Sequence, residues 1–138
     1  MKKIITISLL AIMLVPFVIS NQKKTANTSI EAFRDSWNET NNALRLEKIR
    51  SYWHDGSKYV DKTQTIEGVE GIDNLINGFQ EKNPDAVMRI DSLTTFMNYY
   101  AWYWNIQNGT SEIIQNGYNY AELDEEGKFI RIISFKAE

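Results

Sequence analysis

The chain has 138 residues, of which 43% are hydrophobic and 24% charged, a composition typical of one globular domain rather than a disordered segment. Its formal net charge of -3, without a cluster of Lys and Arg, gives no electrostatic reason to expect nucleic acid as a partner. The sequence has no cysteine and only one histidine, so disulfides and thiolate metal sites are excluded, and we expect no metal and no cofactor.

The N-terminus has the pattern of a secretory signal. Lys2 and Lys3 precede an apolar run over residues 4–19, and Ser20 offers a small residue for cleavage. We therefore expect residues 1–20 to be a signal peptide, residues 21–27 a polar linker, and the mature protein to be exported, periplasmic or extracellular, without membrane contact. A retained N-terminal membrane anchor is the alternative, although the run is shorter than the roughly 20 apolar residues that span a bilayer.

Two helices are expected at the start of the domain, which covers residues 28–138. Thr28 and Glu31 fit a capping box, and apolar residues then recur every three or four positions along the first helix. A shorter helix over about residues 46–53 is expected to end at His54 and Gly56, because glycine readily takes the left-handed backbone that closes helices.

Short strands and a third helix follow. Residues 57–61 and 63–67 have the alternation and β-branched content of strands. The apolar residues between Val69 and Gln80 repeat with a helical period, which Asn83 and Pro84 end.

Beyond Pro84 the sequence predicts an antiparallel meander. Four strand patterns cover residues 86–97, 99–107, 111–123 and 128–135. Asn108-Gly109 is a strong hairpin signal, and Gly127 supplies a left-handed position at the end of the last loop.

The strand over residues 99–106 is aromatic on both faces. Tyr100, Trp102 and Trp104 point to one side, whereas Tyr99 and Tyr103 point to the other. A sheet with one wet face should alternate apolar and polar residues, so we expect helices and a pocket on one face and a second subunit on the other. The alternative is that aromatic residues are tolerated on a solvated face.

Several segments together carry a resemblance to the nuclear transport factor 2-like superfamily, and within it to the SnoaL-like branch. They are Trp37-Asn38, Tyr59-Val60-Asp61, the glycine-flanked stretch at 66–72, Gly117-Tyr118-Asn119 and the acidic loop at 124–130. The resemblance covers residues 30–135. It implies an α+β cone, in which three N-terminal helices pack on a strongly curved, mostly antiparallel sheet around an apolar cavity, and a homodimer through the outer sheet face.

The resemblance places Asp61 where ketosteroid isomerase and related pocket enzymes have a proton-transferring carboxylate. Lost hydration in an apolar cavity would raise the pKa of Asp61 toward the range of a general base. The alternative is that Asp61 and Lys62 simply make the turn after a strand. Trp37 and Asn119 stand at the positions of the isomerase's two oxyanion donors, and an indole N–H and a carboxamide can each still donate a hydrogen bond.

Four further residues are candidates for the ligand pocket. Trp102 and Trp104, with Tyr100 beside them, could stack on a flat or apolar ligand, although packing in the core or a dimer interface is favoured for them; Tyr59 is a further ligand-binding candidate. His54 could orient a ligand, but a lone histidine at a helix end more commonly makes a structural hydrogen bond.

Three classes of function follow. In the first, the exported domain binds a small apolar molecule in its cone-shaped pocket without catalysis. In the second, it is an isomerase, cyclase or hydrolase that uses Asp61 as general base. In the third, the aromatic outer face makes it a protein-interaction module. The residues themselves leave open whether the chain is an enzyme.

Overall fold

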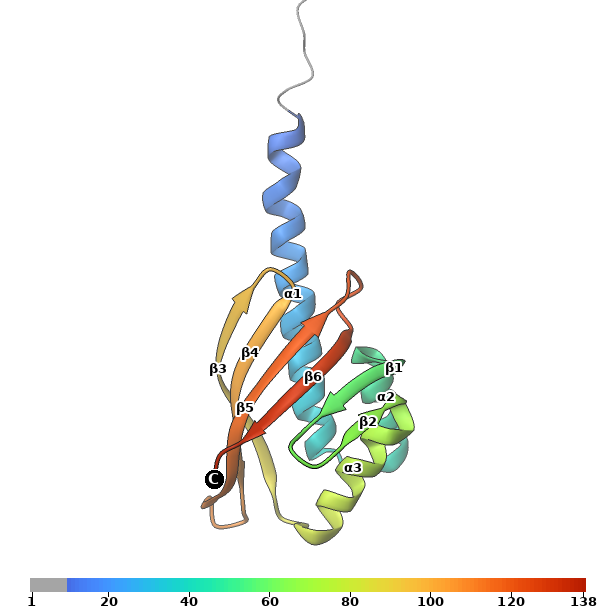
Figure 1. The fold of residues 1–138 in the computed structure, drawn as a ribbon, viewed down its shortest axis with the longest axis vertical. Helices are drawn as coiled ribbons and strands as arrows, with labels where there is room; N and C mark the ends of the chain where they lie inside the picture. The colour runs from blue at the N-terminus through green and yellow to red at the C-terminus, as the bar shows by residue number, and fades with distance from the viewer. Residues whose placement is uncertain (1–9) are drawn as a thin grey trace, which may run out of the picture.

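Three helices and six strands form the folded chain in the computed structural model, which describes residues 10–138, with side chains from residue 24 onward. Figure 1 shows their arrangement. The elements are α1 (Leu10–Asn38), α2 (Asn42–Tyr52), β1 (Trp53–Val60), β2 (Thr65–Glu67), α3 (Gly68–Lys82), β3 (Val87–Phe96), β4 (Tyr99–Gln107), β5 (Ile113–Leu123) and β6 (Phe129–Lys136).

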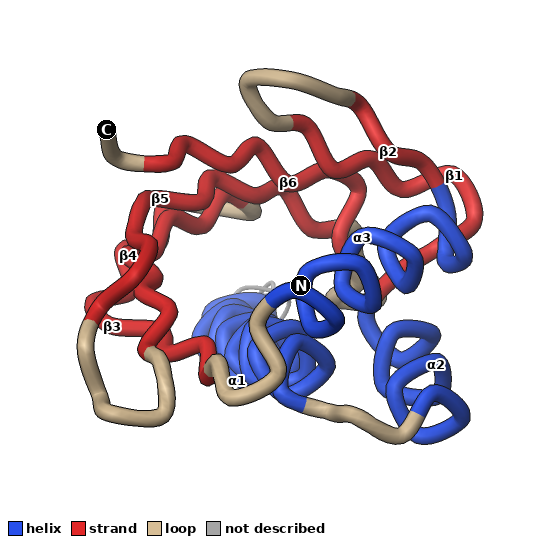
Figure 2. The backbone as a smooth tube through the Cα atoms, turned by 90° about the horizontal axis from the view of Figure 1, so that it is seen from below, coloured by secondary structure: helices blue, strands red, loops and turns tan. Residues whose placement is uncertain are grey.

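The strands make one sheet in the order β2-β1-β6-β5-β4-β3. Strands β3 to β6 form the predicted antiparallel meander, whereas β1 pairs in parallel with β6 and antiparallel with β2. Figure 2 shows the sheet bending around α1 and α3, with α2 farther from the sheet. The structure therefore confirms the predicted α+β cone with a curved, mostly antiparallel sheet.

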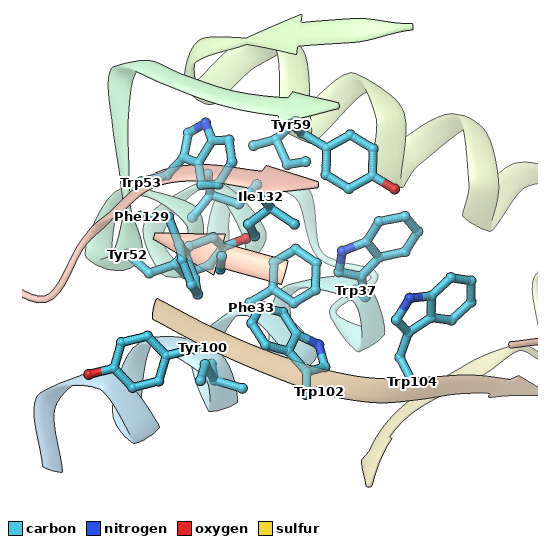
Figure 3. Packing of buried hydrophobic residues seen from close by; sticks show 14 of the residues in the cluster. Phe33, Trp37, Tyr52, Trp53, Tyr59, Tyr100, Trp102, Trp104, Phe129 and Ile132 are labelled. Atoms are coloured by element: carbon cyan, nitrogen blue, oxygen red, sulfur yellow. The ribbon is translucent and has the colours of Figure 1, made fainter. Parts of the chain in front are cut away.

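Aromatic side chains fill the centre between α1 and the sheet (Figure 3). Phe33 of α1 is fully buried, and its ring centroid lies 5.9 Å from Tyr52, 5.9 Å from Trp102 and 6.2 Å from Phe129. Edge-to-face packing of this kind adds to the stability gained from burial. This packed centre holds α1 and α2 against the meander.

A buried arginine joins α2 to α3. Arg45 is 1% exposed, and its Nε donates to Asp73 Oδ1 at 2.6 Å. Its terminal nitrogens donate to side-chain oxygens of Asn42, Asn77 and Gln80. Because all three guanidinium nitrogens donate hydrogen bonds, the buried charge is compensated. The contacts with Asp73, Asn77 and Gln80 also hold α3 in place beside the cavity described below.

The first helix differs from the prediction. It runs without a break from Leu10 through the expected linker at 21–27, and Ala26 within that segment is buried. Thr28 lies inside the helix, where its Oγ1 donates to the Lys24 carbonyl at 3.0 Å, so the expected capping box is wrong. No glycine or proline occurs between residues 17 and 38, and nothing in the local sequence therefore stops the helix.

The N-terminal prediction lies only partly within the described chain. Residues 1–9 of the expected signal peptide are outside the described residues. Within the part of the chain that the structure describes, no helix is long and apolar enough to cross a membrane.

The end of the second helix also differs from the prediction. Helix α2 ends at Tyr52, and His54 and Gly56 belong to β1. Gly68 instead has a left-handed backbone, with φ 81°. A Cβ on Gly68 would lie 3.1 Å from the Asp55 carbonyl oxygen. This close approach and the left-handed backbone together require glycine, and neither can be seen in the residues next to Gly68 in the sequence. The left-handed Gly127, with φ 80°, is confirmed.

Candidate functional site

A cavity of about 680 Å³ lies between the C-terminal half of α1, α3 and the inner face of the sheet. Its apolar wall comes from Phe33, Trp37, Leu75, Phe79, Met88, Trp104 and Ile106. Its polar lining includes Tyr59, Asp61, Lys62, Thr63, Gln115, Asn119, Ser134 and Lys136. A mostly apolar hollow with a few polar groups is the usual form of a small-molecule site.

Strands β1 and β6 separate beside the cavity. Their pairing ends at Val60 and Ile133, although β6 continues to Lys136. The chain beyond β1 turns away through residues 61–64, and the exposed Lys62 and Lys136 line this part of the cavity.

The end of α1 places Trp37 in the cavity wall. Asn38 makes two hydrogen bonds with the backbone of Met88: its Nδ2 donates to the carbonyl at 3.0 Å, and its Oδ1 accepts from the N–H at 2.8 Å. These bonds fix the last turn of α1 to β3. The ring of Trp37 then packs edge-to-face on Phe79, with centroids 5.5 Å apart. The positioning role of Asn38 was not anticipated, since no local pattern shows its distant partner.

Three buried polar atoms around this cavity have no hydrogen-bond partner within the described chain. They are Trp37 Nε1, Trp104 Nε1 and Asn119 Oδ1. Figure 3 shows the two indoles near each other on the same side of the core as Tyr59. Leaving a buried donor or acceptor unsatisfied costs about 1–3 kcal/mol, and folded proteins normally avoid it. The three residues that carry these atoms line the cavity, although the atoms themselves are covered and Trp102 Nε1 in the packed core is likewise unpartnered in the described part of the chain.

Tyr59 adds a hydroxyl to the same lining. Its side chain is 7% exposed, and burial raises the pKa of Tyr59 to about 12, although a hydrogen bond with Ser134 acts in the opposite direction. The phenol therefore stays neutral at physiological pH and can donate a hydrogen bond.

Asp61 lies at the rim of the cavity with both carboxylate oxygens engaged. Oδ1 accepts from the N–H and hydroxyl of Thr63, each at 2.8 Å, and from the Gln64 N–H at 3.1 Å, while Oδ2 accepts from Gln64 Nε2 at 3.2 Å. Partial burial raises the pKa of Asp61, but these hydrogen bonds together outweigh it and lower the pKa below its ordinary value. The expected rise in its pKa is wrong, and the geometry is that of a turn cap.

Trp102 and His54 lie outside this cavity. Trp102 is 1% exposed in the packed core beside Phe33. His54 extends from β1 toward the loop between β5 and β6, where its Nε2 lies 2.6 Å from Asp124 Oδ2. The cavity thus brings together Trp37, Tyr59, Asp61, Trp104 and Asn119, but neither of these other two candidates.

The contacts of His54 are those of a residue that fixes the loop between β5 and β6. His54, Asp124 and Glu126 bring one potential metal-ligand atom each within 4.8 Å of one another. However, Asp124 Oδ1 also accepts from the backbone N–H groups of Glu126 and Lys128, both at 2.9 Å. These bonds account for the position of the carboxylate without a bound ion.

The architecture is that of the nuclear transport factor 2-like fold, as comparison with solved structures shows. A proposed isomerase of the SnoaL-like family from Agrobacterium tumefaciens superimposes with a TM-score of 0.76 at 21% identity, over 83% of this chain and 99% of that chain. A proposed SnoaL-like polyketide cyclase from Jannaschia gives 0.62 at 14% identity, over 80% and 85%. A nuclear transport factor 2-like protein of unknown function from Exiguobacterium gives 0.62 at 14%, over 83% and 98%.

These structures confirm the resemblance drawn from the sequence, at the level of the fold. No family model matches the chain, and no curated protein matches it either. Because a shared fold of this kind carries many functions, the function must be argued from the cavity.

Proposed function

We propose that the chain is an exported ligand-binding domain that holds a small, mostly apolar molecule in the cavity lined by Trp37 and Trp104. The observation that carries this proposal is a mostly apolar cavity of about 680 Å³ whose lining includes three side chains with polar atoms that are unpartnered within the described chain: Trp37 Nε1, Trp104 Nε1 and Asn119 Oδ1. A small rotation of these side chains would present the atoms to a ligand in the cavity, and pairing would then satisfy them.

The same atoms define the chemistry of the ligand. Its body is apolar and preferably flat, because aromatic side chains supply much of the wall. Its inner end carries an oxygen that accepts from an indole N–H, such as a carbonyl, and a hydroxyl on the ligand can donate to Asn119 Oδ1. The ligand class is therefore an oxygenated polycyclic or similarly rigid hydrophobic molecule.

Catalysis with Asp61 as general base is the second candidate function. In its favour, Asp61 lines the same cavity, and two structures of this fold are named as a proposed isomerase and a proposed cyclase. Against it, turn donors engage both carboxylate oxygens, and the pKa of Asp61 is lowered. A general base at neutral pH needs the opposite shift, so binding is the better-supported function.

We also propose that the chain forms a homodimer through the outer face of the sheet. Tyr118 on that face is 59% exposed, and its ring packs against Tyr103 of the neighbouring strand with centroids 5.3 Å apart. Tyr99 and Tyr120 form a second, stacked pair at 5.7 Å. Rigid aromatic pairs of this kind suit the centre of a protein interface.

A matched pair of probes tests the binding proposal. Fluorenone and fluorene are planar tricyclic molecules of nearly the same shape, and only fluorenone has a carbonyl oxygen. Quenching of tryptophan fluorescence should show saturable binding of both, with fluorenone about tenfold tighter, which corresponds to one satisfied buried hydrogen bond. Equal affinities, or no saturable binding, would remove the basis of the proposal.

Two substitutions locate the bound probe. Trp37→Phe should reduce the preference for fluorenone, because it removes one unpartnered N–H and keeps an aromatic ring. Trp102→Phe is the control, since Trp102 lies outside the cavity and its loss should leave the preference unchanged.

A further inference from the structure

Two lysines of the cavity lining lie at the same end of the sheet. Because β1 and β6 run parallel, their carboxyl ends point the same way, and Figure 1 shows both strands ending at that end of the sheet. Lys62 follows shortly after Val60, the last paired residue of β1, and Lys136 is the last residue of β6. The parallel pairing thus brings two positive charges to one end of a mostly apolar cavity.

The cavity meets solvent at this same end. Trp104 and Ile106 of its wall are buried. The exposed residues of the lining all come from the turn after β1 and the end of β6: Lys62, Thr63, Phe135 and Lys136. A lysine can lay its methylene stem along apolar surface while its ammonium group stays in water. The two ammonium groups are therefore available to the solvent-facing end of a bound molecule.

These ammonium groups have little compensation within the described chain. Lys62 Nζ lies 3.8 Å from Glu138 Oε1, but both side chains are almost fully exposed, and such pairs contribute little. Lys136 has no ion-pair partner among the described residues. Asp61 is the remaining charged residue of the lining, and donors of its own turn engage both of its oxygens. The lining thus carries two positive charges and one negative, although the whole chain has a net charge of -3.

On the basis of the proposed binding function, we propose that the ligand is an amphipathic acid, with a rigid apolar body and a carboxylate at its solvent-facing end. The apolar body packs on the aromatic wall, and the carboxylate lies near the ammonium groups of Lys62 and Lys136. One negative charge on the ligand matches the excess of one positive charge in the lining. Because lysine presents a point charge on a flexible stem, the pair selects for the charge of the ligand rather than for its exact shape.

A matched pair of probes isolates the charge. 9-Oxofluorene-2-carboxylate and its carboxamide both keep the ketone of fluorenone and have nearly the same shape, but only the first is charged at neutral pH. Fluorescence titration of the chain should show that the carboxylate binds about fivefold tighter at low salt, as expected for two solvent-screened ion pairs. Sodium chloride at about 0.5 M should reduce this preference, because salt screens charges at the surface.

Two double variants locate the preference. The double variant Lys62→Gln and Lys136→Gln should lose the preference for the carboxylate, and saturable binding of the carboxamide shows that this variant is folded. The double variant Lys58→Gln and Lys82→Gln is the control. It removes the same charge from exposed positions outside the cavity lining, so it should keep the preference.

Fluorenone itself distinguishes a failure of charge selection from a failure of binding. If fluorenone binds but the wild-type chain does not prefer the carboxylate to the carboxamide, the proposed acid is wrong and the binding function stands. A preference that persists without Lys62 and Lys136, or that is lost equally in the control variant, would also overturn the acid. If none of the three molecules binds, both proposals fail.

Discussion

The indole of Trp104 lies across Gly117 on the neighbouring strand. A Cβ at position 117 would come 2.8 Å from Trp104 Cζ2 and 2.1 Å from the Phe135 carbonyl oxygen. Residues 104 and 117 are directly paired between β4 and β5. Glycine at this position therefore makes room for the indole that forms part of the cavity wall.

Gly117→Ala should destabilise the fold and weaken binding of fluorenone. The added methyl group meets backbone as well as a side chain, so β5 or β6 must shift, at a cost of roughly 1–3 kcal/mol. Urea unfolding and the fluorescence titration measure the two effects. The control is Gly78→Ala in α3, where a Cβ would meet nothing within 4 Å; this change should stabilise the protein by about 0.5–1 kcal/mol. Similar effects of the two substitutions would contradict the packing described here.

Asn119→Leu should raise stability while it lowers affinity. Asn119 is 2% exposed, and its Oδ1 has no partner within the described chain. Leucine has a similar size and removes the unsatisfied group, so the free energy of unfolding should increase by about 1 kcal/mol. A ligand with a hydroxyl group, such as 2-hydroxyfluorenone, should bind more weakly to the variant. A variant that is less stable yet binds as tightly as the wild type would show that Asn119 serves the fold alone.

Stability should fall in acid through Asp61 and Asp124. For Asp124, partial burial raises the pKa, but hydrogen bonds from His54 and the loop backbone outweigh it; Asp61 is likewise lowered by its turn donors. A carboxylate whose folded pKa is lowered stabilises the fold above its unfolded pKa of about 4, and this contribution is lost as the pH falls through the lower folded value. Urea unfolding between pH 7 and pH 3 measures the decline.

Asn substitutions separate the two carboxylates. Asp61→Asn and Asp124→Asn should each make the decline below about pH 4 shallower, because the group that titrates is gone. Asp35→Asn serves as a control, since its carboxylate pairs with the neighbouring Arg34 at the surface and surface pairs contribute little. An acid decline that is identical in all four proteins would contradict the assignment.

Tyr118→Lys should convert a dimer into a monomer. It places a charge at the centre of the aromatic outer face, where a second copy would have to bury it. Size-exclusion chromatography with light scattering gives the mass directly. Leu44→Lys is the control, because Leu44 is 47% exposed on α2, away from that face. If the wild-type chain is already a monomer at micromolar concentration, the dimer proposal is wrong.

The parts of the fold that were predictable from the sequence depend on local periodicity. The third helix and the strand Tyr99–Gln107 have clear periods, and the structure places them where those periods indicate. The start of α1 was misplaced because the polar residues at 21–27 contain no helix breaker. The end of α2 was misplaced because it depends on contacts distant in the sequence: Trp53 Nε1 donates to the Gly68 carbonyl at 3.1 Å.

In the candidate site, too, local periodicity predicts some features, whereas others depend on contacts distant in the sequence. The alternation in β4 places Trp102 and Trp104 on one inner face, but it cannot show that Trp102 packs beside Phe33 in the filled part of the cone while Trp104 reaches the hollow part. The hydrogen bonds that engage Asp61 could be anticipated from its turn, whereas the unpartnered state of the indoles depends on the whole surrounding structure.

The central claim is that a ligand pairs with the two indoles of the cavity, and the indole N–H signals of a ¹⁵N-labelled chain test it most directly. The chain has four tryptophans, and single Trp→Phe substitutions assign their signals. On addition of fluorenone, the signals of Trp37 and Trp104 should shift strongly, whereas that of Trp53, which already donates to Gly68, and that of the core residue Trp102 should move little. Unchanged signals of Trp37 and Trp104 at saturating fluorenone would contradict the account.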